Sequence, residues 1–169
     1  MPHHKSMVPE GFNVPERLVT ETFTLRPLLA KDAEVDFEAW TTSVEHLQGI
    51  FGPRSSWPST DIGLEDNTID LAWHQREHEM RSSFAFAVVS PDDTTSLGCV
   101  YFTSARKLGY EVETYYWVRA SQLRSGLDIA LGDAVRSWLK DDWPFQRIAY
   151  PGRDVQWPQY EALEDQPHW

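Results

Sequence analysis

The amino-acid sequence predicts an α+β fold, a mixed α/β sandwich in which helices flank a central, mostly antiparallel sheet. Three extended segments follow one another over residues 84–120, and an amphipathic helix separates them from a last short strand. With 169 residues, 41% of them hydrophobic, the chain is long enough for one domain with its own core. We expect an irregular N-terminal arm over 1–20 and a single domain over 21–169.

The first half of the domain predicts one strand, two helices and a long loop. Residues 22–28 alternate polar and apolar side chains, and residues 32–48 and 66–81 carry apolar side chains at helical spacing. On the second helix we expect one common face for Ile69, Trp73, Arg76 and Met80. The loop 49–63 embeds Phe51 and Trp57, and long ordered loops often carry function.

The second half predicts three antiparallel strands, over 84–89, 97–103 and 109–120. The clearest helix follows, with a capping-box-like start at Ser125 and Asp128, and then a short strand over 146–150. A crossing helix makes the strands on either side of it parallel neighbours. A last short helix fits around 159–164.

Composition excludes several classes of function. A net charge of −11 argues against nucleic-acid binding and against docking on anionic membranes. Cys99, the one cysteine, lies in an apolar strand and is expected to be a core thiol. No stretch approaches 18 apolar residues, and the first residues lack a signal-peptide pattern. We therefore expect a soluble cytoplasmic protein.

Residues 74–78 read His-Gln-Arg-Glu-His and match the H-x-x-E-H pattern of one class of zinc hydrolase. Such a site needs a third protein ligand, which the sequence does not offer. The favoured interpretation is a solvated helix face around His74 and His78, with no metal.

The junction between the third strand of the series and the long helix can hold an anion. Free N–H groups and the positive end of the helix dipole meet there, and Arg119 and Arg124 flank it in an otherwise acidic chain. Diphosphate binding and an ordinary capped helix with two solvated arginines explain this segment equally well.

The order of elements and three local phrases resemble the Gcn5-related N-acetyltransferase superfamily, in particular its ribosomal-protein acetyltransferase-like branch. Residues 24–28 read Thr-Leu-Arg-Pro-Leu, like the family's first strand, and residues 113–118 resemble its fourth strand. Residues 124–131 stand where the family has the end of its R/Q-x-x-G-x-G/A acetyl-CoA loop. The resemblance covers roughly residues 20 to 150, so 21–169 is expected to be an acetyltransferase-like domain.

The sequence departs from the family pattern at the loop and at the C-terminus. Ser121, Arg124 and Asp128 replace expected residues, and only Gly126 of the fingerprint survives. The Asp128 carboxylate would repel a nearby diphosphate, which Arg124 could offset. The family continues with a helix and two strands, whereas 19 residues follow Tyr150 here.

The resemblance implies acetyl-CoA as co-substrate and no metal cofactor. Val118, Arg119 and Ala120 would face the pantetheine arm. The diphosphate would meet backbone N–H groups of Arg124, Ser125, Gly126 and Leu127. A carboxylate would deprotonate the amine. Glu113 is the best match and Glu111 the second, although the two could merely line a solvent-facing stripe. Tyr150, or Tyr160, is the candidate acid.

The leading hypothesis is therefore an acetyl-CoA-dependent N-acetyltransferase acting on a primary amine of a small molecule or a protein. A catalytically inactive module of the same fold, binding an acyl-CoA or a partner chain, is the alternative, and a zinc hydrolase is the third. Aromatic residues in irregular segments, Trp57, Trp157 and Trp169, also suggest a homodimer that covers the last strand.

Overall fold

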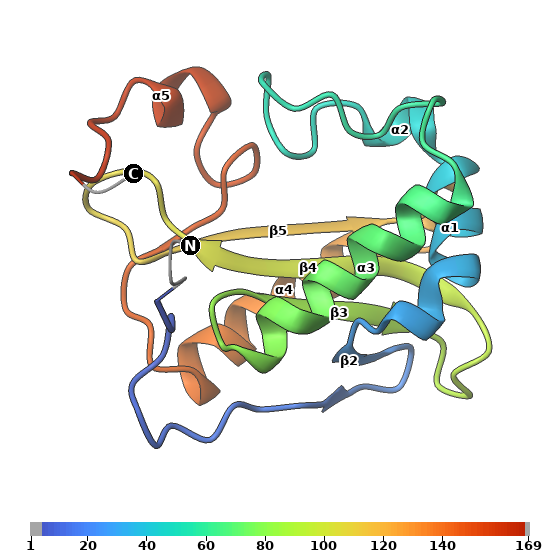
Figure 1. Cartoon of the computed structure of the whole chain (residues 1–169), viewed down its shortest axis with the longest axis horizontal. Coiled ribbons are helices and arrows are strands. Elements are labelled where there is room, and N and C mark those ends of the chain that lie inside the picture. The colour runs from blue at the N-terminus through green and yellow to red at the C-terminus, as the bar shows by residue number, and fades with distance from the viewer. Residues whose placement is uncertain (1–4, 168–169) are drawn as a thin grey trace.

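The computed structural model describes residues 5–167, which form one six-stranded sheet with helices on both faces (Figure 1). The strands lie in sequence order, antiparallel from β1 to β5, and β6 is parallel to β5. Their bounds are β1 Leu18–Val19, β2 Thr24–Pro27, β3 Phe84–Val89, β4 Ser96–Ser104, β5 Val112–Val118 and β6 Ile148–Ala149. The predicted mixed, mostly antiparallel sheet and its parallel last pair are confirmed.

Two hydrophobic clusters lie on opposite faces of this sheet. The α4 face buries Val100, Tyr116 and Leu131, whereas Trp40, Tyr101 and Trp117 lie on the face covered by α1 and α3. The alternation along β4 and β5 sends successive side chains to opposite faces. The helices are α1 Ala33–Thr41, α2 Val44–Leu47, α3 Leu64–Glu79, α4 Leu127–Asp142 and α5 Trp157–Glu161, with short 3-10 turns at Ala30–Asp32 and Ala120–Gln122.

The N-terminal arm is more than a loose extension. From residue 5 to 17 it is irregular, as expected, but Leu18 and Val19 pair with β2 and Val8 is buried in the core. Residues 1–4 of the predicted arm lie outside the described part of the chain. The arm therefore contributes apolar surface to the α4-side cluster.

The apolar residues predicted to share one face of α3 lie on its exposed side. Ile69, Trp73 and Met80 are 53%, 65% and 40% exposed. The buried residues of α3 are instead Asn67 and Leu71, and the Asn67 side-chain amide donates to the Asp36 carboxylate of α1. The inward side of α3 therefore includes a polar contact with α1.

Two further expectations at helix ends are wrong. The predicted helix over 32–48 is interrupted between α1 and α2, where the Ser43 hydroxyl donates to the carbonyl of Ala39. The predicted capping box of Ser125 and Asp128 does not form, because Gly126 is the N-cap and the Asp128 carboxylate pairs with Arg153.

Candidate functional site

Beyond Glu113 no strand of residues 5–167 lies beside the outer edge of β5, because β6 pairs with it over only two residue pairs, Val112 with Ile148 and Glu113 with Ala149. The odd-numbered residues of β5 form the backbone hydrogen bonds to β4. The hydrogen bond from the Arg119 amide to the Leu97 carbonyl, just beyond the end of β5, fixes this alternation. The backbone groups of 114, 116 and 118 therefore point away from β4, toward the outer edge of β5. Free strand edges of this kind can pair with an extended ligand.

Side chains of the protein itself already contact two of the carbonyls on this outer edge. Arg153 donates to the Tyr116 carbonyl at 2.8 Å, lies 3.6 Å from the centre of the Tyr116 ring, and pairs with Asp128 at 2.8 Å. At the other end His46 Nε2 lies 3.1 Å from the Val118 carbonyl oxygen. A ligand that pairs with this edge must displace the Arg153 side chain to reach the Tyr116 carbonyl.

The segment from β5 into α4 places its glycine where the sequence resemblance needs one. Gly126 has a φ of +81°, in the left-handed region that favours glycine, and a Cβ there would meet nothing within 4 Å. The amide of Leu127 donates to the Ser125 hydroxyl, and the amides of Asp128 and Ile129 lie in the first turn of α4, where no intrahelical acceptor exists. The start of α4 therefore combines open space at Gly126 with two backbone N–H groups that have no acceptor inside the helix.

The other predicted binding residues of this segment have partners inside the protein. Arg119 donates to Glu38 at 2.6 Å and to the Ser96 carbonyl, and the Ala120 amide donates to Ser43. The Ser125 amide donates to the Gln122 carbonyl, and the Ser125 hydroxyl oxygen accepts from the amide of Leu127. Arg124 is exposed, and Leu127 is buried in the core.

The two predicted glutamates do not share a site. Glu113 is 2% exposed and accepts from Arg106, so the alternative of a solvent-facing stripe is wrong. Glu111 accepts from the amides of Gln146 and Arg147, and these bonds lower its pKa. Glu111 therefore holds the start of β6 in place.

The two candidate tyrosines lie on opposite sides of the sheet. Tyr150 lies under the Arg136 guanidinium, 4.4 Å from it, and burial raises its pKa to about 12. Tyr160 is fully buried in α5, and burial together with the neighbouring Glu113 raises the pKa of its phenol. The roles of the glutamates and tyrosines in catalysis remain predictions.

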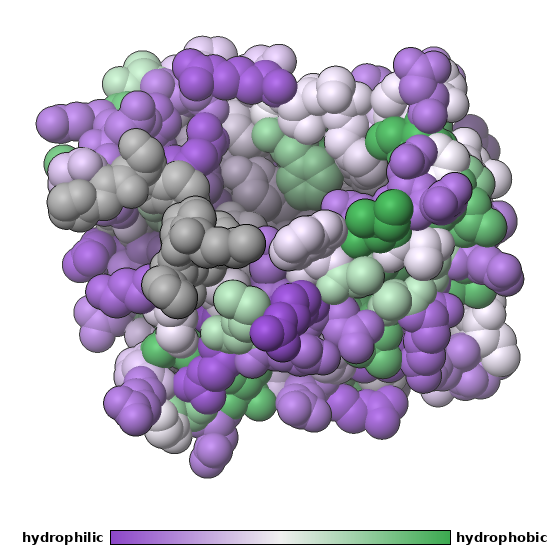
Figure 2. Space-filling model, in the orientation of Figure 1, coloured by the Kyte–Doolittle hydropathy of each residue, from purple (hydrophilic) through white to green (hydrophobic). Residues whose placement is uncertain are grey.

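A cavity of about 270 Å³ lies on the α3 face of the sheet, and Figure 2 shows this face hollowed above α3. Its walls come from α1, α3, β4, β5 and the loop 49–63. Phe51 connects the loop to the sheet, because its ring packs 5.2 Å from Trp57, 5.2 Å from Tyr101 and 5.3 Å from Tyr115. The long loop predicted from the sequence is thus an aromatic wall.

A buried carboxylate forms the polar part of this cavity. Asp36 is 4% exposed, accepts from the Asn67 amide at 3.0 Å, and lies 3.4 Å from the Cys99 thiol. Burial raises its pKa to about 6. His74 lies beside it and pairs with Asp70 at 3.5 Å. Sequence reasoning missed Asp36 and Asp70, since single carboxylates on helices look like solvated ones.

The histidine pair of the H-x-x-E-H pattern is divided between two environments. His74 packs on Tyr101 in the cavity, whereas the His78 ring lies about 5 Å from Phe84 and Phe86. The interpretation as a solvated face is therefore wrong. Within residues 5–167 no group of three or more His, Cys, Asp or Glu side chains could hold a metal ion.

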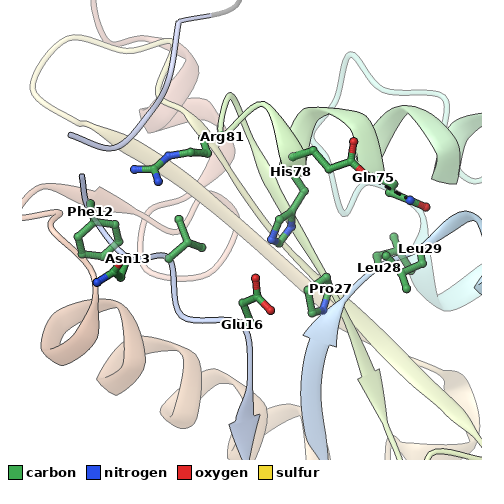
Figure 3. Close-up of a pocket in the computed structure, with 11 residues that line it drawn as sticks. Phe12, Asn13, Glu16, Pro27, Leu28, Leu29, Gln75, His78 and Arg81 are labelled. Atoms are coloured by element: carbon green, nitrogen blue, oxygen red, sulfur yellow. Dashed lines mark hydrogen bonds between the residues drawn. The ribbon is translucent and has the colours of Figure 1, made fainter. Parts of the chain in front are cut away.

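A second, larger cavity of about 500 Å³ lies between the N-terminal arm, β2 and α3 (Figure 3). The His78 ring points into it toward the Glu16 carboxylate of the arm, and Phe12 lies on its far side. Burial lowers the pKa of His78. This cavity contains no buried carboxylate and lies away from β5.

Comparison with known proteins identifies the fold. Neither family models nor curated protein sequences match the chain. Among solved structures, ribosomal-protein-S5-alanine acetyltransferase from Vibrio fischeri matches over 88% of this chain and 81% of its own, with a TM-score of 0.64 and 18% identity. The ribosomal L7/L12 α-N-protein acetyltransferase RimL, in complex with coenzyme A, matches over 75% and 70%, with a TM-score of 0.60 and 15% identity.

A third match is the microcin C7 self-immunity acetyltransferase MccE in complex with acetyl-CoA and AMP, with a TM-score of 0.61 and 14% identity over 76% of this chain and 68% of that one. The sheet, its diverging last pair and the loop into α4 thus define an acetyltransferase-type mixed α/β sandwich. The fold is that of the Gcn5-related N-acetyltransferase superfamily, which confirms the resemblance predicted from the sequence.

The residues at β5 and α4 fit acetyl-CoA at one end of the site. The open Gly126 and the free amides of Asp128 and Ile129 suit a diphosphate. Along the strand, a pantetheine arm would compete with Arg153 for the Tyr116 carbonyl. The diphosphate position at the start of α4 is therefore open, whereas the position of the pantetheine arm along β5 becomes free only when the Arg153 side chain moves.

No helix in residues 5–167 combines the length and the apolar character that a membrane crossing requires.

Proposed function

We propose that this protein is an acetyl-CoA-dependent N-acetyltransferase that acts on a primary amine. The observation that carries the proposal is the conjunction of an edge of β5 without a neighbouring strand among residues 5–167 and an open, glycine-started helix N-terminus at its end. Bound there, acetyl-CoA would supply an activated thioester carbonyl. Backbone N–H groups at Gly126, Asp128 and Ile129 would hold the diphosphate, and the unpaired edge of β5 would orient the arm.

The candidate proton acceptors for the substrate amine are the carboxylates of Asp36 and Glu113. An ammonium group must become a neutral amine before it can attack a carbonyl carbon. Asp36 lines an accessible cavity, and its raised pKa makes its carboxylate a better proton acceptor than an ordinary one. Glu113 is buried and bonded to Arg106, so we place proton acceptance at the Asp36 carboxylate.

The second candidate function is a catalytically inactive module of the same fold. Arg153 favours it, because this side chain covers the Tyr116 carbonyl and holds Asp128 close to the start of α4. A protein that no longer binds acetyl-CoA could keep such contacts permanently. The two functions differ in whether Arg153 can be displaced.

Calorimetric titration with acetyl-CoA separates the transferase from an inactive module that has lost the cofactor site. We expect micromolar binding by the wild type and at least tenfold weaker binding by Gly126→Val, whose side chain intrudes on the diphosphate site. Gly126→Asn is the matched variant for backbone strain, since asparagine tolerates a positive φ. If neither the wild type nor Arg153→Ala binds at millimolar acetyl-CoA, the inactive module is the better description.

A further inference from the structure

The cavity on the α3 face contains a buried carboxylate with no lysine or arginine partner among residues 5–167. Asp36 is 4% exposed, and its hydrogen-bond partners are the neutral Asn67 amide and the neutral Cys99 thiol. The nearby cationic candidate is His74, which pairs with Asp70; Asp70 and Asp36 both raise the pKa of His74, so this one imidazole is shared by two carboxylates. Buried carboxylates are normally paired with a cation or a metal, because desolvating the charge is costly.

The cavity walls are of the kind that attract an organic cation. Phe51 and Trp57 come from the loop, and Tyr101 and Tyr115 come from the sheet, so aromatic rings border the space from two sides. Ring faces carry negative electrostatic potential and attract alkylammonium groups within about 6 Å. A hydrated metal ion or an anion gains nothing from such walls.

The volume of the cavity and the negative charge around it restrict the kind of ligand further. About 270 Å³ is below the range of roughly 300–1,000 Å³ that holds drug-sized ligands, so a short alkyl chain with its ammonium group fits better than a large molecule. The exposed Asp70 carboxylate at the rim and the net charge of −11 favour the approach of cations.

We infer that the cavity bounded by Asp36, Phe51, Trp57, Tyr101 and Tyr115 binds an alkylammonium group, with the Asp36 carboxylate as its ion partner and the aromatic rings as its walls. This inference deepens the proposed function, on which its role as acceptor site rests, by naming the class of acceptor. A free short alkylamine and the side chain of a lysine in a peptide share this chemistry.

Calorimetry in the absence of acetyl-CoA tests the inference. The probes are n-butylamine, cadaverine and Nα-acetyl-lysine methylamide, with n-butanol as the uncharged counterpart. We expect at least one amine to bind at least tenfold more tightly than n-butanol. Preference for the free amines or for the lysine derivative distinguishes the two sources of the ligand.

Two variants show where the amine binds. Asp36→Asn should weaken amine binding at least tenfold, whereas Asp133→Asn, an exposed charge on α4 at the other face of the sheet, should change it less than twofold. Trp57→Leu removes an aromatic wall and should weaken binding at least threefold. Circular dichroism and thermal melting check that each variant is folded.

The outcomes separate this inference from the proposed function. Amine binding that depends on Asp36 without acetyl-CoA binding upholds the cavity and overturns the transferase. Acetyl-CoA binding together with amines that bind no better than n-butanol, or equally well to Asp36→Asn, overturns the inference and leaves the transferase standing.

Discussion

Asp36 shows how one buried side chain can dominate the pH dependence of stability. Burial raises its pKa from 3.8 to about 6, against the smaller opposing effects of Asn67, Cys99 and His74. The folded state therefore holds this proton more tightly than the unfolded chain does. Stability from this group is complete below about pH 4 and is lost as pH rises through about 6.

We expect Asp36→Asn to remove the loss of stability that the wild type shows as pH rises through about 6. The rise from 3.8 to about 6 corresponds to roughly 3 kcal/mol, so the variant should gain up to about that much relative to the wild type between pH 4 and 7. Urea unfolding of both proteins across this range measures the difference. A constant difference would show that Asp36 titrates normally in the folded protein.

The residue scale also marks the limit of sequence reasoning. Gly126 was predicted from a one-residue remnant of a fingerprint, and the structure gives it the left-handed φ that a glycine supplies. Asp36 could not be predicted in the same way, because its meaning depends on Asn67 and Cys99, which lie 31 and 63 residues away. Burial by distant segments has no local signal.

At the scale of elements, the close packing of α4 on β5 depends on Gly132. A Cβ at this position would lie 2.5 Å from the Tyr116 hydroxyl and 2.8 Å from the Arg136 guanidinium. The Arg136 guanidinium donates to the Tyr116 hydroxyl at 3.0 Å. The glycine therefore sets how closely the helix approaches the strand.

We expect Gly132→Ala to destabilise the protein, although alanine favours a helix interior by about 1 kcal/mol over glycine. Overpacking of a tight contact costs about 1–3 kcal/mol and should outweigh this gain. Ser137→Ala, at an exposed position of α4, is the control and should be neutral or slightly stabilising. Denaturant midpoints measure both, and a net gain for Gly132→Ala would show that Tyr116 and Arg136 move aside easily.

Strands were predicted better than helix faces for a physical reason. The pattern over 84–89 gave β3 its observed bounds, since six consecutive apolar residues are buried on both faces of a central strand. The pattern of α3 did not show which side of the helix is buried, because that side includes Asn67, which donates to Asp36 and accepts from the Trp40 indole. Hydropathy cannot anticipate a polar network in a helix interface.

For the whole molecule, the homodimer remains a prediction, although one of its arguments is wrong. Trp57 and Trp157 were expected outside the core, but Trp57 packs on Trp40 and Trp157 stacks on Tyr115; Trp169 lies outside the described residues. The short edge strand β6 is the argument that stands. Light scattering at high micromolar concentration should give twice the chain mass of 19.5 kDa, and a monomer would contradict the dimer.

The C-terminal segment is held to the sheet by a buried lysine. Lys107, 4% exposed, donates to the carbonyls of Glu161 and Leu163 and pairs with Asp165 at 2.7 Å. These bonds anchor the chain beyond β6 against the connection between β4 and β5. Within residues 5–167, α5 is the one helix that follows β6.

We expect Lys107→Met to detach this segment while leaving the central sheet folded. Three acceptors would lose their donor, and Trp157 would lose the support that keeps its ring against Tyr115 and Gly52. Because Tyr115 is a wall of the α3-face cavity, amine binding should weaken as well. Limited proteolysis should cut the variant after residue 150 faster than the wild type, with Lys140→Met, at an exposed lysine of α4, as the control. Equal cleavage rates would mean that the aromatic contacts of Trp157 and Tyr160 alone hold the segment in place.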